Sequence, residues 1–336
     1  MTDFSGFVNL NKPKGWSSHD CVARLRRLLN TKKIGHSGTL DPLATGVLPI
    51  AVGRATRLIQ YLPSGKAYRA TVRFGVTTST DDLEGDVLTR NSAEHLRAHD
   101  VEALLPQFIG TLSQTPPMFS AVQVDGKRLY DLARKGKQIE VPSREVEIRS
   151  LSIAAWREGD APEMVLDVEC GPGTYIRSLA RDIGAAVGTG ATLAGLERTQ
   201  SNGFEIGESL TLERIEQAIA AQESTFRLSS AAEAVQHLDA IALTSPLAKR
   251  WCMGQKLALN EPGISFEGVS FENSDLREAE MESVDLETAI AQMQTPFRIL
   301  CDRTFLGIGE ARLSDYGETA DTKHAILVPK MVFTPA

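Results

Sequence analysis

Residues 35–52, GHSGTLDPLATGVLPIAV, join an irregular glycine-rich loop to a continuous apolar run. The run Val47–Val52 has the length and composition typical of a buried strand. The loop before it holds three glycines and one proline around a single carboxylate, Asp41. Catalytic groups concentrate on constrained loops that a rigid scaffold positions. Asp41 is therefore either a catalytic carboxylate or a turn residue that bonds its own backbone ahead of Pro42.

The charge around this loop is strongly positive. Residues 12–73 hold twelve Lys and Arg but only two acids, Asp20 and Asp41. Because neighbouring cations stabilise a carboxylate, we expect the pKa of Asp41 to lie below its usual value of about 3.9. An ionised Asp41 could act as a nucleophile or electrostatic stabiliser, but not as a general acid. The basic stretch itself indicates either a polyanionic partner such as nucleic acid or a solvated basic face.

Length and composition narrow the class of protein. The chain has 336 residues, which suggests about two domains. Its 42% hydrophobic and 24% charged residues exclude collagen, coiled coil and wholesale disorder. The four cysteines show no CxxC spacing, so neither a zinc knuckle nor a disulfide framework is indicated. Met1–Trp16 lacks a secretory apolar region, and the longest uncharged apolar stretch is too short for a membrane span. We expect a reduced, cytoplasmic protein.

Strand and helix patterns alternate along the first two thirds of the chain. Strands are expected at 7–10, 47–52, 68–74, 119–124 and 164–170, and helices at 17–30, 92–108, 128–135 and 175–187. The two kinds of element mix without a regular βαβ period, which favours a mixed sheet flanked by helices over a Rossmann arrangement.

The pattern changes from about Ala240. Short strands at 298–301, 305–311 and 325–332 predict a small β-rich domain over 240–336, following a larger domain over 1–239. Inside it, residues 261–290 hold nine acids against one base. Large apolar residues recur there every fifth position from Phe266 to Leu286. This is either a short pentapeptide-repeat-like solenoid or an acidic insertion with accidental spacing.

Two other patterns suggest sites but are incomplete. Gly171-Pro172-Gly173 follows a strand and precedes a helix, yet the third glycine of a dinucleotide-binding loop is missing. His95 and His99 lie four residues apart, but Leu96 stands where a zinc protease would have its glutamate. We expect no nucleotide cofactor and no metal.

The loop at 35–48 resembles the signature loop of the TruB family of pseudouridine synthases. Further similar blocks are NKPKGWSS at 11–18, KAYR at 66–69, MFSA at 118–121, GKRLY at 126–130 and GTYIR at 173–177. They follow the family's order across roughly residues 5–210. The resemblance implies an α+β (mixed α/β) fold with a central, mainly antiparallel sheet. It also implies a PUA-like RNA-binding domain at the C-terminal end.

The resemblance also implies an activity. The family isomerises uridine 55, in the T loop of tRNA, to pseudouridine without a metal or cofactor. Asp41 would attack the nucleoside, so that the glycosidic bond breaks and the uracil rejoins through C5. Such an enzyme must flip the uridine out of its loop, which costs a few kcal/mol. We expect a monomer that acts on the T arm of tRNA without an obligate protein partner.

Individual roles follow from the same resemblance. Tyr68 would stack on the target base and take part in proton transfer, and Arg177 would pair with Asp41. Substrate-binding roles are implied for Lys12, His36, Arg128, Tyr175 and Leu196. His36 would fill the space that the flipped base leaves. Two other functions stay open: a tRNA-binding folding helper, and the catalytic subunit of a guide-RNA-dependent complex.

Overall fold

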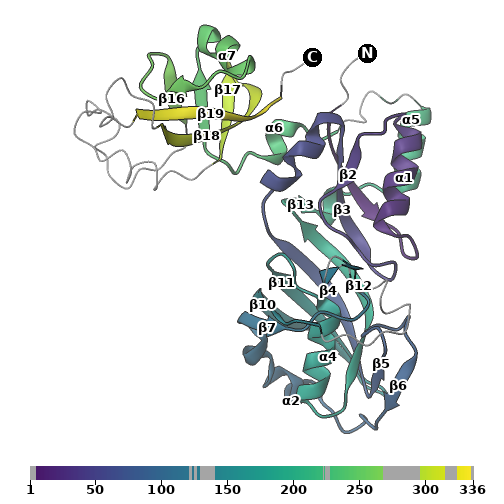
Figure 1. Ribbon diagram of the computed structural model, residues 1–336. Helices are drawn as coiled ribbons and strands as arrows, with labels where there is room; N and C mark the ends of the chain where they lie inside the picture. The colour runs from purple at the N-terminus through teal and green to yellow at the C-terminus, as the bar shows by residue number, and fades with distance from the viewer. Residues whose placement is uncertain are drawn as a thin grey trace.

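The computed structural model describes residues 5–120, 123–124, 127–128, 141–221, 223, 228–267, 296–314 and 324–333. Figure 1 shows two parts: a large curved sheet with helices around it, and a smaller β-rich part at the C-terminal end. Both parts match the α+β fold expected from the sequence.

The large sheet has nine strands in the order β1-β3-β12-β4-β11-β10-β7, with β2 paired to β3 and β13 to β12. The strands are β1 (Gly6–Lys12), β2 (Ile34–His36), β3 (Thr45–Val52), β4 (Lys66–Phe74), β7 (Gly110–Gln114), β10 (Arg144–Arg157), β11 (Glu163–Cys170), β12 (Ala191–Ser201) and β13 (Phe204–Glu205). Every pairing among them is antiparallel except that of β12 with β3. The expected mixed, mainly antiparallel sheet is confirmed.

Helices surround this sheet. They are α1 (Ser18–Leu28), η1 (Gly53–Tyr61), α2 (Ala98–Glu102), η2 (Leu105–Phe108), α4 (Ile176–Ala186), η3 (Ile206–Glu208), α5 (Leu212–Ala220) and α6 (Ala231–Ala234). α1 begins where expected, because Ser17 and Asp20 form a capping box. In the part of the chain that the structure describes, no helix is long and apolar enough to cross a membrane.

One helix prediction was wrong in extent. Instead of a single helix over 92–108, the structure has only the short α2 and η2. Pro106 lacks the amide hydrogen that a continuing helix would need, so the two turns stay separate. Two hairpins complete this region: β5 (Val76–Thr78) with β6 (Val87–Arg90), and β8 (Gln123–Val124) with β9 (Lys127–Arg128). Of the strand expected at 119–124, β8 forms, residues 119–120 are not in a strand, and 121–122 lie outside the described residues. Arg128, the expected start of a helix over 128–135, lies in β9 instead, and 129–135 lie outside the described residues.

The second sheet has six strands in the order β15-β19-β18-β17-β14-β16. Its elements are β14 (Ala240–Leu243), α7 (Ser245–Cys252), β15 (Leu257–Ala258), β16 (Ile264–Glu267), β17 (Phe297–Cys301), β18 (Thr304–Ser314) and β19 (His324–Val332). The three strands expected near the C-terminus are thereby confirmed. β16 contains the start of the five-residue periodicity, and the rest of it lies outside the described residues.

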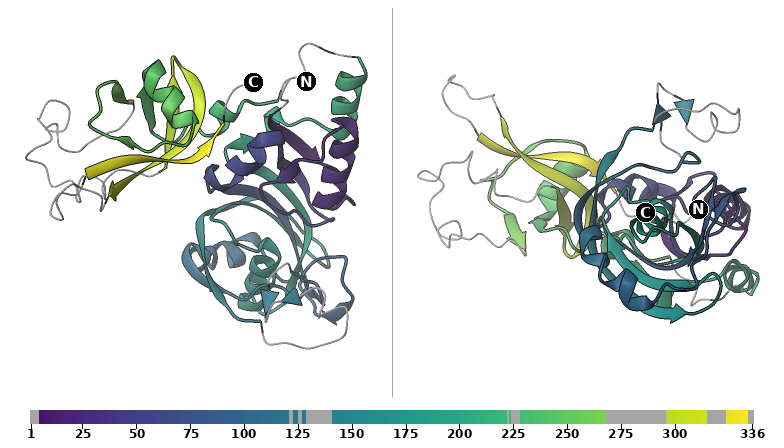
Figure 2. Two further views of the ribbon diagram at one scale, coloured as in Figure 1. Left: turned by 45° about the horizontal axis from the view of Figure 1, so that its top comes forward. Right: turned by 90° about the horizontal axis from the view of Figure 1, so that it is seen from below.

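Each of the two sheets has an apolar cluster of its own. The larger one packs α1 and α4 against the nine-stranded sheet, and another surrounds Trp251 in the second sheet. A third cluster joins the two parts, because Phe305 and Met331 of the second sheet pack with Phe7 and Val235. Figure 2 shows this junction from two further directions.

Candidate active site

Asp41 and Arg177 form an ion pair although they are 136 positions apart in the sequence. The Nη2 of Arg177, at the start of α4, lies 3.0 Å from Oδ2 of Asp41. Its Nη1 lies 3.5 Å from Oδ2 of Asp82. The same guanidinium donates to the carbonyls of Thr80 at 3.1 Å and Phe119 at 3.0 Å. A single buried arginine therefore connects the Asp41 loop to two other segments.

Asp82 is the residue of this cluster that the sequence analysis missed. Its buried carboxylate accepts hydrogen bonds from Thr80 Oγ1 at 2.5 Å and from the backbone of Glu84 at 3.1 Å. The backbone beside it is tied to β12, since the amide of Leu83 donates to the carbonyl of Leu193. In the sequence Asp82 belongs to an acidic turn, and nothing local shows that this acid meets Arg177.

The electrostatics of Asp41 differ from expectation. The predicted fall in its pKa was wrong: burial raises the pKa of Asp41, and the charge of Asp82 raises it further. Arg177 and Lys12 act in the opposite direction without overcoming desolvation. The basic neighbours can be counted in the sequence, but the cost of partly removing this carboxylate from water follows only from the fold.

The backbone on both sides of Asp41 is fixed. The hydroxyl of Ser18 accepts from the amide of Leu40 at 2.8 Å and donates to its carbonyl at 3.2 Å. On the other side, the amide of Gly15 donates to the carbonyl of Pro42 at 2.8 Å. The start of α1 and the turn before it thus hold the loop from one side.

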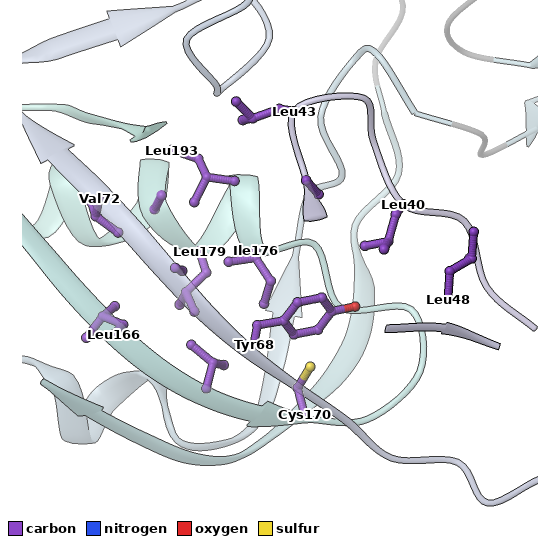
Figure 3. Packing of buried hydrophobic residues seen from close by; sticks show 14 of the residues in the cluster. Leu40, Leu43, Leu48, Tyr68, Val72, Leu166, Cys170, Ile176, Leu179 and Leu193 are labelled. Atoms are coloured by element: carbon purple, nitrogen blue, oxygen red, sulfur yellow. The ribbon is translucent and has the colours of Figure 1, made fainter. Parts of the chain in front are cut away.

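Tyr68 approaches the loop of Asp41 from strand β4. Its ring is buried on β4 near Ile176 and Cys170, and its hydroxyl points toward the loop that carries Leu40 (Figure 3). Burial raises the pKa of Tyr68, while the charge of Arg198 lowers it. The phenol is therefore neutral in the free protein, and the charge of Asp41 raises its pKa further.

Lys12 is close to Asp41 but is not presented to solvent. Its side chain is 0% exposed, and its ammonium donates to the carbonyls of Trp16 at 2.6 Å and Pro13 at 3.0 Å. Desolvation lowers the pKa of Lys12, and the charge of Asp41 partly offsets this. In this arrangement Lys12 shapes the turn after β1 and adds positive potential behind Asp41.

His36 lies on β2 with its ring partly buried. The ring of His19 meets it edge-on with centroids 5.7 Å apart. Burial lowers the pKa of His36, which keeps the imidazole neutral near pH 7. Its Nδ1 is buried and finds no hydrogen-bond partner among the described residues.

The other implied binding residues lie around this centre. Leu196 is partly buried on β12 opposite Ala70. Tyr175 caps α4, and its ring carries the guanidinium of Arg144 4.6 Å from the centroid. Arg128 belongs to β9, and its side chain lies outside the described residues. Asp41, Tyr68, Arg177 and Lys12 therefore form the centre.

In the described part of the chain, no three His, Cys, Asp or Glu residues are arranged so that they could hold a metal ion. His99 instead contacts Asp100, with 3.3 Å between Nε2 and Oδ1. The central groups are thus carboxylates, a phenol and cations on a rigid scaffold, which is a set suited to nucleophilic and proton-transfer chemistry.

Comparison with solved structures identifies the class of this fold. The chain resembles Cbf5 in a Cbf5–Nop10–Gar1 complex with a TM-score of 0.68 and 26% identity, over 99% of this chain and 86% of that one. The archaeal Nop10–Cbf5 complex gives a TM-score of 0.65 at 26% identity, over 99% and 88% of the two chains. The fold is that of the pseudouridine synthases.

Sequence comparison narrows the class. Residues 26–176 match the model of the TruB family pseudouridylate synthase N-terminal domain, and 177–242 match that of the tRNA pseudouridylate synthase B C-terminal domain. A relative from Nostoc sp. named tRNA pseudouridine synthase B is 49% identical over 98% of this chain and 99% of the relative. One of the same name from Gloeothece citriformis is 54% identical over 76% and 82%. The chain belongs to the TruB family and is a pseudouridine synthase, an isomerase.

Proposed function

We propose that this chain is a tRNA pseudouridine synthase that isomerises uridine 55 in the T loop. The observation that carries the proposal is the Asp41–Arg177–Asp82 cluster, which holds one partly exposed carboxylate beside a buried tyrosine. The substrate is supported by relatives named tRNA pseudouridine synthase B at 49–54% identity.

Asp41 supplies the nucleophilic carboxylate. Its side chain is 40% exposed, so a nucleoside can reach it, while the Arg177 side chain is 6% exposed and lies behind it. The ion pair orients the carboxylate and favours its charged form against desolvation. During the isomerisation the bond from C1′ to N1 breaks, a bond from C1′ to C5 forms, C5 loses a proton and N1 gains one.

Tyr68 supports the base and the proton transfers. Its ring forms part of the apolar floor below the Asp41 loop, where a uracil can pack against it. Its hydroxyl points into the site and is the group that we assign to proton transfer from C5. Because the phenol is neutral in the free protein, it must pass on its own proton as it accepts the one from C5, and N1, which gains a proton in the isomerisation, balances the exchange.

The implied RNA contacts surround this centre. His36 presents a neutral, partly buried ring that can occupy the gap left by the flipped uridine. Leu196 and Tyr175 add apolar contacts, Lys12 adds positive potential, and Arg128 is assigned to the T-arm phosphates. Phosphate contacts of this kind supply affinity rather than sequence choice.

Two alternatives are separated by experiment. A folding helper would not require Asp41, Arg177 and Asp82 to be joined in one cluster, although the same basic residues could serve it. The second alternative, a guide-RNA-dependent complex, is prompted by a structure at 23% identity, which is of an H/ACA RNP bound to a substrate RNA. That likeness shows the fold alone, whereas the relatives at 49–54% identity favour the enzyme that acts by itself on tRNA.

The test is pseudouridine mapping with the purified chain on an unmodified tRNA and on its isolated T-arm hairpin. We expect conversion at position 55 of both RNAs without a guide RNA, protein partner, nucleotide or metal. Conversion only with a guide RNA would support the ribonucleoprotein function, and tight binding without conversion would support the folding helper. A tRNA with cytidine at position 55 is the matched substrate control and should stay unmodified.

A further inference from the structure

A second arginine, Arg198, lies behind the Asp41 loop and takes no part in the assignments above. It is on β12, the strand that runs between β3 and β4. There it is paired with Tyr68 of β4 on one side and with Gly46 of β3 on the other. Directly paired residues on neighbouring strands project to the same face of a sheet. Arg198 therefore lies on the strand between β4, which carries Tyr68, and β3, which follows the Asp41 loop.

The guanidinium of Arg198 binds the loop itself. Its Nε donates to the carbonyl of Val47 at 2.7 Å, and Nη2 donates to that of Gly38 at 3.1 Å. A longer contact of 3.5 Å joins Nη1 to the carbonyl of Thr39. These acceptors precede and follow Asp41, so one rigid fork spans the loop from its beginning to its end.

The guanidinium of Arg198 is buried, which costs desolvation free energy that its hydrogen bonds must offset. Arg198 is 0% exposed, and among the described residues its guanidinium makes no ion pair with a carboxylate. A buried cation without a carboxylate partner needs well-placed hydrogen bonds to offset its desolvation. Its hydrogen-bond partners are backbone carbonyls. Tyr68 is its direct partner on the neighbouring strand, and the charge of Arg198 lowers the pKa of the Tyr68 phenol. The side chain of Arg198 thus contacts the loop of Asp41 from the strand paired with Tyr68, and it is not open to RNA.

Gly46 shows how closely β12 approaches the loop. It has φ +98°, in the left-handed region that favours glycine. A Cβ there would collide with the carbonyl oxygen of Arg198. The backbone and the side chain of Arg198 therefore fix the same short loop at two points.

We propose that Arg198 is a positioning residue for the isomerisation, whose guanidinium fixes the loop of Asp41 in register with the hydroxyl of Tyr68. The inference rests on the proposed function. It assigns no contact with the substrate to Arg198, because the side chain is buried. It separates Arg198 from Arg177, which contacts the carboxylate of Asp41 itself.

The experiment measures single-turnover rate constants and affinity for the T-arm hairpin in Arg198→Lys. Lysine keeps the charge but cannot donate to three separated carbonyls at once. We expect the rate constant to fall on the order of 100-fold, the effect of a small misplacement of reacting groups, with unchanged affinity. Arg298→Lys is the matched control, because Arg298 also donates through Nε to a carbonyl, that of Leu238, but in the second sheet.

A double-variant cycle measures the coupling between Arg198 and Tyr68, which a purely structural role of Arg198 would not produce. If Arg198 acts through Tyr68, the loss in Arg198→Lys combined with Tyr68→Phe is smaller than the product of the two single losses. Losses that multiply would overturn the proposal. A wild-type rate in Arg198→Lys, or a loss confined to affinity, would also overturn it.

Folding and activity are kept separate in this design. The number of RNA-binding sites per chain is titrated first, so that unfolded protein is not counted as slow enzyme. Arg198→Gln removes the buried charge and so lowers the risk of misfolding; we expect it to bind RNA and to be slow as well. Failure of both variants to fold would mean that Arg198 is purely structural, which contradicts the proposal. An inactive wild-type chain would instead contradict the proposed function.

Discussion

The loop of Asp41 is held by two arginines that differ in almost every respect. Arg177 faces the site, pairs with Asp41 and Asp82, and begins a helix. Arg198 lies behind the loop on a central strand, and the part of the loop that it contacts is backbone. The comparison teaches that one cation can set the charge of a carboxylate while another sets its position.

Among the residues around Asp41, the largest expected effect concerns Tyr68. We expect Tyr68→Phe to lower the single-turnover rate constant by about 10²–10⁴-fold, because the variant loses a proton-transfer group but keeps the ring. Affinity for the T-arm hairpin should stay at the wild-type value. Rapid-quench assays with radiolabelled uridine measure the rate, and normal turnover would remove the proton role.

The Asp82→Asn variant tests how the charges around Asp41 set its pKa. We expect a rate loss on the order of 100-fold, because the amide cannot pair with Arg177 as the carboxylate does. The negative charge of Asp82 raises the pKa of Asp41, so its removal lowers that pKa. The acid limb of the rate profile, where Asp41 gains its proton, should therefore move to lower pH.

The control for Asp82→Asn is Arg198→Lys. It keeps a positive charge behind the loop, so we expect a slower rate with the acid limb in place. An acid limb that moves in Arg198→Lys but not in Asp82→Asn would reverse the roles that we assign to the two sides of the loop.

A smaller effect is expected at His36. Because burial lowers its pKa, we expect it to act through a neutral ring rather than a charge. His36→Phe should then keep most of the activity, whereas His36→Ala should lose about tenfold in rate on account of a poorly held flipped state. Single-turnover rates for both variants between pH 6 and 8 measure this. A Phe variant as slow as the Ala variant would show that a ring nitrogen is needed.

The smallest effect is expected far from both arginines. Glu267, at the end of β16, and Arg298, near the start of β17, both pair with Ala240, on opposite edges of β14. Two strand spacings separate them, roughly 10 Å. We expect a six-residue Gly-Ser linker in place of 268–295 to leave the rate on the T-arm hairpin unchanged. A large loss would mean that the acidic segment supports the fold, in line with a solenoid.

Much of the fold was readable from the sequence. The periodicity of 21–29 and a serine cap, at Ser17 or Ser18, indicated α1, and the structure has Ser17 as the cap. The apolar run after Asp41 indicated β3. Patterns that depend on one local signal were predicted well. The helix over 92–108 failed because a proline inside the apolar pattern was given too little weight.

Residues of the site could be predicted from the sequence only where they lie in a recognisable motif. Asp41, Tyr68 and Arg177 lie in blocks that resemble a known family, and the predicted ion pair forms. Asp82 and Arg198 lie outside those blocks, and their partners are contributed by distant strands and loops. The direction of the pKa shift of Asp41 was missed for the same reason, because burial is a property of the assembled fold.

The central claim is that Asp41 is the nucleophile of a uridine isomerase whose substrate is tRNA. The most direct measurement is pseudouridine mapping of an unmodified tRNA after incubation with wild type and with Asp41→Asn, with affinity measured for both. We predict conversion at position 55 by wild type alone, a loss of at least about 1,000-fold in the variant, and equal affinity. Conversion by Asp41→Asn at a rate near that of wild type would contradict the account.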